Sequence, residues 1–334
     1  MKNFLTIVML LAILSFAGIV NANTLTAVKN KGFVQCGVNT GLPGFSSADE
    51  KGMWKGLDVD ICRAVAAAVL GDANKVKYTP LTAKERFTAL QSGEIDILAR
   101  NTTWTLTRDA SLGINFAGVS YYDGQGFMVN KNLGVKTAKE LNGATVCLHA
   151  GTTTELNLAD YFRVNGMQYK VVTYDTADAT VKGYDAGRCD VLTSDQSQLY
   201  SLRIKLNKPE SSIILPDVIS KEPLGPVVRQ GDDQWFNVVK WSLFTLINAE
   251  ELGLASGNID KMKSSKDPAV SRMIKGQGNK LGLDDAWSYN IIKQVGNYAE
   301  IFERNIGQTT PLKIKRGLNA LWNKGGLQYA PPFR

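Results

Sequence analysis

The chain has 334 residues, with 38 lysine and arginine residues against 31 aspartate and glutamate residues, so its formal charge is +7. Hydrophobic residues make up 44% and charged residues 21%, a balance typical of a folded chain and not of wholesale disorder. The length is sufficient for two domains, each with its own core. His149 is the only histidine, which excludes mechanisms and metal sites that need two or three imidazoles.

The first 22 residues have the parts of a secretory signal peptide. Lys2 precedes an apolar run that ends near Val20, and Val20 and Ala22 provide the small residues of a cleavage site. The apolar run is shorter than the roughly 20 residues of a bilayer span, so cleavage near Ala22 is favoured over a membrane anchor. The first cysteine after the run is Cys36, which is too distant for lipid attachment. We therefore expect an exported protein without a lipid anchor.

The positive charge does not predict nucleic-acid binding. Basic residues are scattered among acidic ones, and the densest cluster, Lys313, Lys315 and Arg316, has no interleaved aromatic residues for base stacking. We expect a solvated basic face and no nucleic-acid partner.

Two parts of the chain repeat one order of elements. In each, a strand that carries a cysteine runs into a polar loop, and later a helix ends at a glycine before a short β-branched strand. This order predicts an α/β fold with two lobes, each a mostly parallel sheet with crossover helices. The corresponding segments are 32–38 and 144–148 for the strands, 39–41 and 150–154 for the loops, and 89–98 and 184–192 for the later units.

Four cysteines in an exported protein favour two disulfides. Three pairings are possible, and we favour Cys36–Cys62 and Cys147–Cys189. The first pair would join a strand to the helix that follows it, and the second would join neighbouring strands of the second lobe. A metal site is the alternative, but the chain has no C-x-x-C spacing and no second histidine to complete one.

Glycine and proline cluster at 123–126 and 221–226, where the chain would cross between the lobes. We therefore expect residues 23–121 and 229–334 in lobe 1 and residues 122–228 in lobe 2, with a two-strand hinge. Polar loops at the carboxyl ends of the strands would face the cleft between the lobes.

Three loop motifs have residues suited to a zwitterion. Thr152 and Glu155 have capping-box spacing, so a helix would begin here, and its free N–H groups could bind a carboxylate or serve only as a capped end. Arg108 follows a strand and suits bidentate carboxylate binding, although a surface pair with Asp109 fits equally well. Asp195 could neutralise an ammonium group or cap the next helix. Spacing alone leaves each pair of alternatives open.

Residues 56–69, GLDVDICRAVAAAV, resemble the signature of the bacterial extracellular solute-binding proteins of family 3, the polar amino-acid group. The motifs at 103–108, 151–153 and 187–195 agree in order. Segments such as 83–93, 100–108 and 123–129 are similar to the group that binds L-amino acids in general for bacterial ABC importers.

The resemblance implies a type II periplasmic-binding-protein fold and a periplasmic, non-enzymatic function without a cofactor. The protein would be a monomer that captures free L-amino acids of broad selectivity between its lobes and delivers them to an ABC permease. The C-terminal part, with Trp287, Ile291, Val295, Tyr298 and Phe302 at helical spacing, would pack on lobe 1.

The same resemblance assigns roles to individual residues. Arg108 would bind the α-carboxylate with the backbone and hydroxyl of Thr153, beside Thr152, and Asp195 would bind the α-ammonium group. Further residues would complete the site: Thr103 and the Asn101 backbone around the ligand, Asn39 where some relatives have an acid, and Leu42 and Ala83 where relatives often have a large aromatic residue. His149 would be structural.

The main alternative is a periplasmic enzyme on the same fold, a dehydratase acting on an amino-acid precursor. It would require a catalytic acid in the cleft, for which Asp195 and Glu155 are the candidates.

Overall fold

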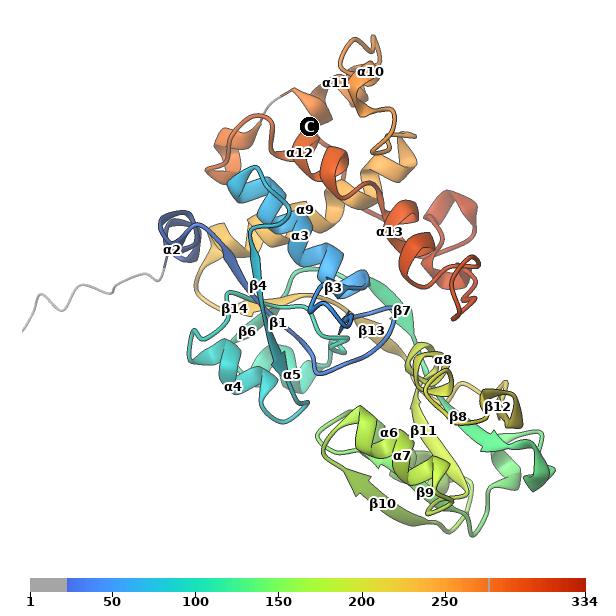
Figure 1. Cartoon of the computed structure of the whole chain (residues 1–334). Coiled ribbons are helices and arrows are strands. Elements are labelled where there is room, and N and C mark those ends of the chain that lie inside the picture. The colour runs from blue at the N-terminus through green and yellow to red at the C-terminus, as the bar shows by residue number, and fades with distance from the viewer. Residues whose placement is uncertain (1–22, 276) are drawn as a thin grey trace, which may run out of the picture.

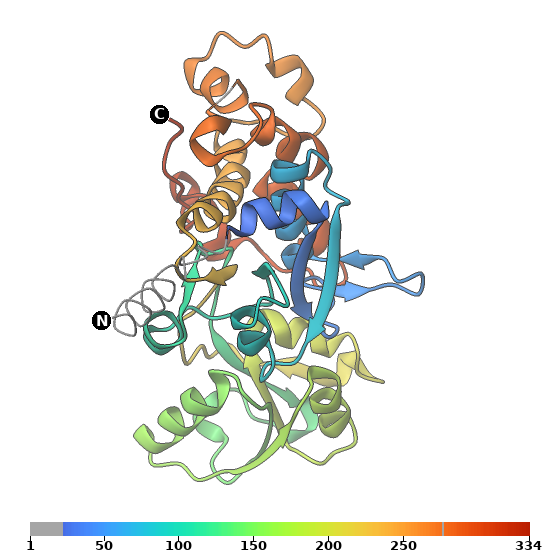
Figure 2. The ribbon, with the colours of Figure 1, turned by 90° about the vertical axis from the view of Figure 1, so that its left-hand side faces the viewer.

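The computed structural model describes residues 23–275 and 277–334, which form two α/β lobes (Figure 1). The predicted signal peptide, residues 1–22, lies outside the described residues. The second lobe is built from the middle of the chain and lies below the first in Figures 1 and 2. Within the described ranges, every helix is too short or too polar to cross a bilayer.

The sheet of the first lobe has the strand order β4-β1-β5-β14-β6. Strands β4, β1 and β5 are parallel, and the antiparallel strands β14 and β6 complete the sheet. Neighbouring residues of one strand point to opposite faces, so that Ile97 packs under the large helical layer and Leu98 packs on the other face. The strand bounds are β1 (Val34–Asn39), β4 (Val76–Leu81), β5 (Ile97–Leu98), β6 (Ile114–Phe116) and β14 (Val227–Arg229), with a separate hairpin of β2 (Ser47–Ala48) and β3 (Trp54–Lys55).

Helices cover both faces of this sheet, and α3 is the central one. Its N-cap, Gly56, has φ +139°, and a Cβ atom there would lie 2.0 Å from the carbonyl oxygen of Phe45, so only glycine fits. The disulfide Cys36–Cys62 joins β1 to this helix, one of the two pairings that the sequence favours. The helices of the lobe are α2 (Thr24–Lys31), α3 (Leu57–Leu70), α4 (Arg86–Gln91), α5 (Leu106–Ser111), α9 (Asp233–Glu251), α10 (Ile259–Met262), α11 (Pro268–Ile274), α12 (Trp287–Gln294) and α13 (Tyr298–Asn305), with short 3₁₀ turns at Gly278–Leu281, Gly317–Asn319 (η6) and Trp322–Lys324.

The second lobe has the strand order β10-β9-β11-β8-β12, with β10, β9 and β11 parallel and β8 and β12 antiparallel. The disulfide Cys147–Cys189 is also present, but Cys189 lies in the turn before β11 and not on the strand itself. The bounds are β8 (Gln125–Asn130), β9 (Thr145–His149), β10 (Lys170–Tyr174), β11 (Val191–Asp195), β12 (Ser212–Ile214), α6 (Thr154–Val164), α7 (Ala177–Asp185) and α8 (Gln196–Arg203), with 3₁₀ turns at Lys131–Leu133, Ala138–Glu140 and Pro209–Ser211.

The chain crosses between the lobes at β7 (Tyr121–Asp123) and β13 (Glu222–Leu224), which pair with each other as an antiparallel ribbon. The return crossing comes earlier than the expected boundary at residue 228. Val227 and Val228 already pair with β5 and β6 in the sheet of the first lobe. The proline and glycine residues that follow β13 thus lie at the start of lobe 1.

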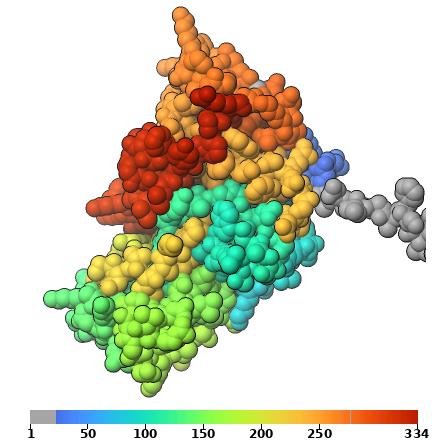
Figure 3. All heavy atoms as spheres, turned by 180° about the vertical axis from the view of Figure 1, so that it is seen from behind, coloured from blue at the N-terminus to red at the C-terminus, as the bar shows by residue number. Residues whose placement is uncertain are grey.

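The C-terminal segment packs on the first lobe, as its apolar spacing predicts. Trp287, Ile291 and Phe302 are buried in the same core as α3 and α9. The segment forms two helices because Gly296 has φ +95° and Asn297 begins α13 with a capping box. In Figure 3 the atoms of this segment, in red, lie on the first lobe above the second.

Candidate functional site

A small cavity lies between the two lobes. The lobes touch beside it, because Lys84 of the first lobe pairs with Asp175 of the second at 2.6 Å, and Lys205 Nζ donates to the carbonyl oxygen of Gly41 at 2.7 Å. The lining of the cavity combines two guanidinium groups, hydroxyls, amides and one carboxylate. The lining residues are Arg86, Asn101, Thr103 and Arg108 from the first lobe and Thr152, Thr153, Thr154, Asp195 and Gln198 from the second.

Arg108 reaches the cavity from α5, the helix that follows β5. The hydroxyl of Thr105 accepts a hydrogen bond from the Arg108 N–H at 3.3 Å and fixes the start of this helix. Arg108 Nη1 donates to the carbonyl oxygen of Thr103 at 2.9 Å, so the guanidinium group turns back toward the loop at the carboxyl end of β5. Burial lowers the pKa of Arg108, while the nearby carboxylates of Glu222 and Asp195 act in the opposite direction.

Asn101 is held in a left-handed backbone conformation, with φ +36°. Its N–H donates to Asp58 Oδ2 at 2.8 Å, and its side-chain oxygen accepts from Asn39 Nδ2 at 3.0 Å. Asp58 belongs to the GLDVD stretch of α3, and burial raises its pKa to about 7. Asn39 therefore holds the side chain of Asn101 in place but does not line the cavity itself.

The loop before α6, together with the first residue of the helix, brings three threonines to the cavity. The expected capping box is absent: α6 begins at Thr154, and neither Thr152 nor Thr153 caps it with a side chain. Thr152 Oγ1 donates instead to the His149 carbonyl oxygen at 2.7 Å, and Thr153 Oγ1 donates to Glu222 Oε2 at 3.0 Å. Because both hydroxyls donate their hydrogen bonds to buried acceptors, they present only oxygen lone pairs to a ligand. The free N–H groups of the first turn of α6 are the donors that remain.

Asp195 is the last residue of β11 and is only 4% exposed. Its Oδ2 accepts a hydrogen bond from Gln198 Nε2 at 2.6 Å, and its side chain does not cap α8. Burial, together with the neighbouring carboxyl groups of Asp123 and Glu222, raises the pKa of Asp195 well above its ordinary value. The carboxylate would be stabilised by a cation placed in the cavity.

Two residues expected at the ligand side chain lie elsewhere. Leu42 is fully buried in the core of the first lobe, in a tight turn with Ser46. Ala83 is buried beside Gly151 of the second lobe. Neither Leu42 nor Ala83 lines the cavity. His149 also stays outside it: one ring nitrogen contacts the Asp175 carbonyl oxygen at 2.9 Å, and burial lowers its pKa to about 4.

Two lining residues were not expected from the sequence, Arg86 and Gln198, whereas Thr154 was expected only as part of the polar loop 150–154. Arg86 opens an amphipathic helix, where an arginine usually faces solvent, and Gln198 lies one helical turn after Asp195. Only their place in a strand-to-helix connection at the cleft edge could have suggested them. Within residues 23–275 and 277–334, no group of three or more His, Cys, Asp or Glu side chains is arranged to hold a metal ion.

Comparison with known proteins agrees with the fold. The sequence profile of the bacterial extracellular solute-binding proteins, family 3, matches residues 34–256, which is more than half of the chain. The chain belongs to this family. The C-terminal helices from α10 onward lie beyond the matched part of the family-3 protein.

Relatives match the family-3 protein over almost its whole length. It is 62% identical over 323 residues to the general L-amino acid-binding periplasmic protein AapJ of Rhizobium johnstonii, with 95% of each chain covered. It is 52% identical over 323 residues to the glutamate/glutamine/aspartate/asparagine-binding protein BztA of Rhodobacter capsulatus, again with 95% of each covered. A solved periplasmic binding protein of an ABC transporter from Brucella ovis, with glutathione bound, has a TM-score of 0.92 at 58% identity and covers 94% of this chain and 100% of its own. All three are named as binding proteins or transporter components and none as an enzyme.

Proposed function

We propose that this protein captures one free L-amino acid in the cavity between its lobes and delivers it to the membrane permease of an ABC importer. The names of the relatives support the ligand class and the importer. The observation that carries the proposal is the lining of one closed cavity by a guanidinium group from one lobe and a carboxylate from the other, Arg108 and Asp195.

This arrangement suits the two charges that every free amino acid carries. Arg108 would bind the α-carboxylate, together with the N–H groups at the start of α6. Asp195 would bind the α-ammonium group, and its raised pKa would fall when that cation arrives. Thr103 and the Asn101 backbone would complete the site. Because the Thr153 hydroxyl donates to Glu222, its oxygen would accept from the ammonium group, while its backbone serves the carboxylate.

Contacts from both lobes would make closure depend on the ligand. An amino acid held by Arg108 alone in an open form would gain the Asp195 contact only when the lobes meet, so binding would favour the closed form. The contacts between Lys84 and Asp175 and between Lys205 and Gly41 support such a closed arrangement. The two crossing strands β7 and β13 would act as the hinge, and the permease would recognise the closed form.

The remaining parts of the proposal concern location and assembly. We propose a monomer that reaches the periplasm after cleavage of residues 1–22 near Ala22. The dehydratase alternative is less well supported, because Glu155 does not line the cavity and Asp195 is already bonded to Gln198.

The proposal can be tested by calorimetry with the purified mature protein and the common L-amino acids. Removal of either charge would leave its partner buried and unpaired, so Arg108→Ala and Asp195→Ala should each weaken binding by about 2–5 kcal/mol. Arg163→Ala is the matched control, because Arg163 is exposed on α6 and pairs only with Asp160. Unchanged affinity in both cavity variants, or no binding of any amino acid, would contradict the proposal.

A further inference from the structure

Arg86 is a buried arginine that faces the cavity without a strong partner. It is the first residue of α4, and it is only 2% exposed. Its Nη2 has one long contact, 3.4 Å, to the carbonyl oxygen of Gly151 in the opposite lobe, and its guanidinium group lies over the ring of Phe87. Among the described residues, no acceptor lies within hydrogen-bonding distance of its Nε.

A structural arginine in the same chain looks different. Arg316 donates through Nε and Nη2 to the Asn319 carbonyl oxygen and pairs with the Glu250 carboxylate at 2.9 Å. Arg86 has no carboxylate within 4.0 Å among the residues that the structure describes, and neither does Arg108. A buried cation without such partners is costly. Arg100 is equally buried without a carboxylate within 4.0 Å among the described residues, but Arg86 lines the cavity, so a partner from outside the chain can reach Arg86.

The charged groups that line the cavity do not match the charges of a neutral amino acid, which has one carboxylate and one ammonium group. Arg86 and Arg108 supply two guanidinium groups to the lining, and Asp195 supplies one carboxylate. Glu222 stands behind the lining, where its oxygens already accept from Thr153 and Asn157. A zwitterion would pair with Arg108 and Asp195 and leave Arg86 without a counter-charge.

We infer that Arg86 is a specificity-determining residue that binds a second carboxylate, so that the site prefers dicarboxylic L-amino acids such as glutamate to their neutral isosteres. The inference rests on the proposed function, which assigns the α-carboxylate to Arg108 and the α-ammonium group to Asp195. A ligand with a third charge pairs every charged group of the lining. Such a ligand also joins the lobes further, since Arg86 belongs to the first lobe and its present contact, Gly151, to the second.

Glutamate and glutamine make the sharpest comparison, because they have nearly the same shape and differ in the charge of the side-chain end. In calorimetry of the unaltered mature protein near pH 7, glutamate should bind at least roughly 10-fold more tightly than glutamine. Equal affinities, or tighter binding of glutamine, would overturn the inference and leave the proposed function standing. If neither ligand binds while another L-amino acid does, the inference fails and the proposed function stands; if no L-amino acid binds, the proposed function itself fails.

Substitution of Arg86 then locates the preference. Arg86→Met should weaken glutamate binding by roughly 30- to 1,000-fold and change glutamine binding by less than about 3-fold. Arg86→Lys should restore part of the glutamate affinity, and the exposed control Arg163→Met should change neither ligand. An equal loss for both ligands would assign Arg86 a positioning role and overturn the inference. If Arg86→Met does not fold, the Arg86→Lys variant and the comparison in the unaltered protein still decide it.

Discussion

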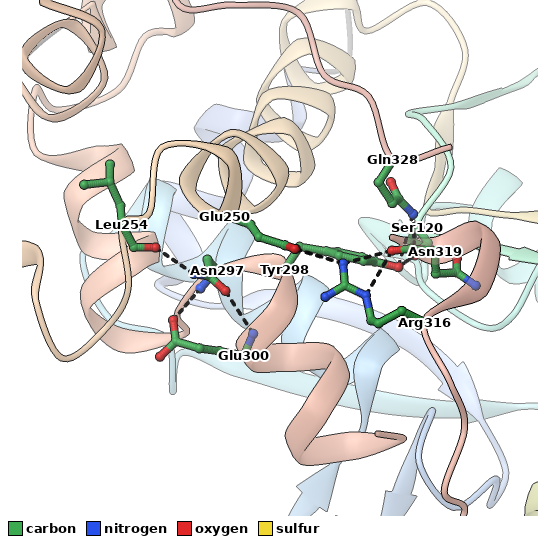
Figure 4. A network of polar contacts seen from close by, with 9 residues as sticks. All are labelled: Ser120, Glu250, Leu254, Asn297, Tyr298, Glu300, Arg316, Asn319 and Gln328. Carbon is green, nitrogen blue, oxygen red and sulfur yellow. Dashed lines mark hydrogen bonds and ion pairs between the residues drawn. The ribbon is translucent and has the colours of Figure 1, made fainter. Parts of the chain in front are cut away.

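The side chain of Asn319, in the C-terminal segment, bonds to the hinge strand β7. Figure 4 shows Asn319 beside Arg316. The carboxamide of Asn319 accepts from the Tyr122 N–H at 2.7 Å and donates to the Tyr122 carbonyl oxygen at 3.0 Å. Tyr122 is the middle residue of β7, and Pro223 of β13 lies opposite it. The proline has no N–H, and Asn319 pairs with the backbone groups on the other edge of β7 as a neighbouring strand would.

Other contacts fix Asn319 in this position. Arg316 donates to its carbonyl oxygen and packs over the rings of Tyr298 and Phe302. The Tyr298 hydroxyl donates to the carbonyl oxygen of Ser120 at 2.7 Å, just before β7. Figure 4 shows Glu250 of α9, Tyr298 of α13 and Arg316 of the final segment converging.

Asn319→Ala should lower the free energy of unfolding by about 1–3 kcal/mol, because two backbone groups lose their partner in a site where Asn319 is only 3% exposed. Asn319→Asp should be at least as destabilising, since a carboxylate can accept from the Tyr122 N–H but repels its carbonyl oxygen. Urea unfolding without ligand would measure both. Asn165→Ala is the control, because that exposed side chain has a single local bond, to Tyr161. If both Asn319 variants unfold within about 0.5 kcal/mol of the unaltered protein, water replaces the carboxamide and the reasoning fails.

Three further predictions concern stability. The pKa of Asp58 is raised to about 7, so the folded protein holds this proton more tightly than the unfolded chain. As the pH rises from about 4 to about 7, the unaltered protein should therefore lose up to about 4 kcal/mol of stability relative to Asp58→Asn. Parallel unfolding curves at all pH values would refute this. The pKa of His149 is lowered to about 4, so the sign reverses: relative to His149→Gln, stability should fall by up to about 3 kcal/mol as pH drops from about 6.5 to 4. A constant difference in calorimetric stability would contradict it. Replacement of both Cys147 and Cys189 by serine opens a link across 42 residues and should lower the urea-unfolding free energy by about 2–4 kcal/mol, and an unchanged midpoint would disprove that expectation.

The sequence alone predicted what depends on local order along the chain. Strand, polar loop and helix recur in both halves, and parallel strands bring their carboxyl ends to one edge, so polar loops could be expected at a common cleft. The roles of Arg108, Thr153 and Asp195 there were implied only by the resemblance to the solute-binding family. The structure brings these three residues to one cavity. The disulfide pairing followed from the same order, since Cys36 lies on β1 and Cys62 on α3, the first helix after that strand.

Only the tertiary structure decided which neighbours share that cavity. Leu42 and Ala83 are buried in packed regions away from the cavity. The sequence suggests that Arg86 is a surface charge on a short helix, but it is buried opposite Gly151 of the other lobe. The Thr152–Glu155 spacing suits a capping box, yet the Thr152 hydroxyl donates to the His149 carbonyl oxygen, and the neighbouring Thr153 hydroxyl donates to Glu222, which is distant in sequence. These outcomes depend on contacts between segments far apart in the chain, and a pattern of neighbouring residues has no information on which distant group will compete for a side chain.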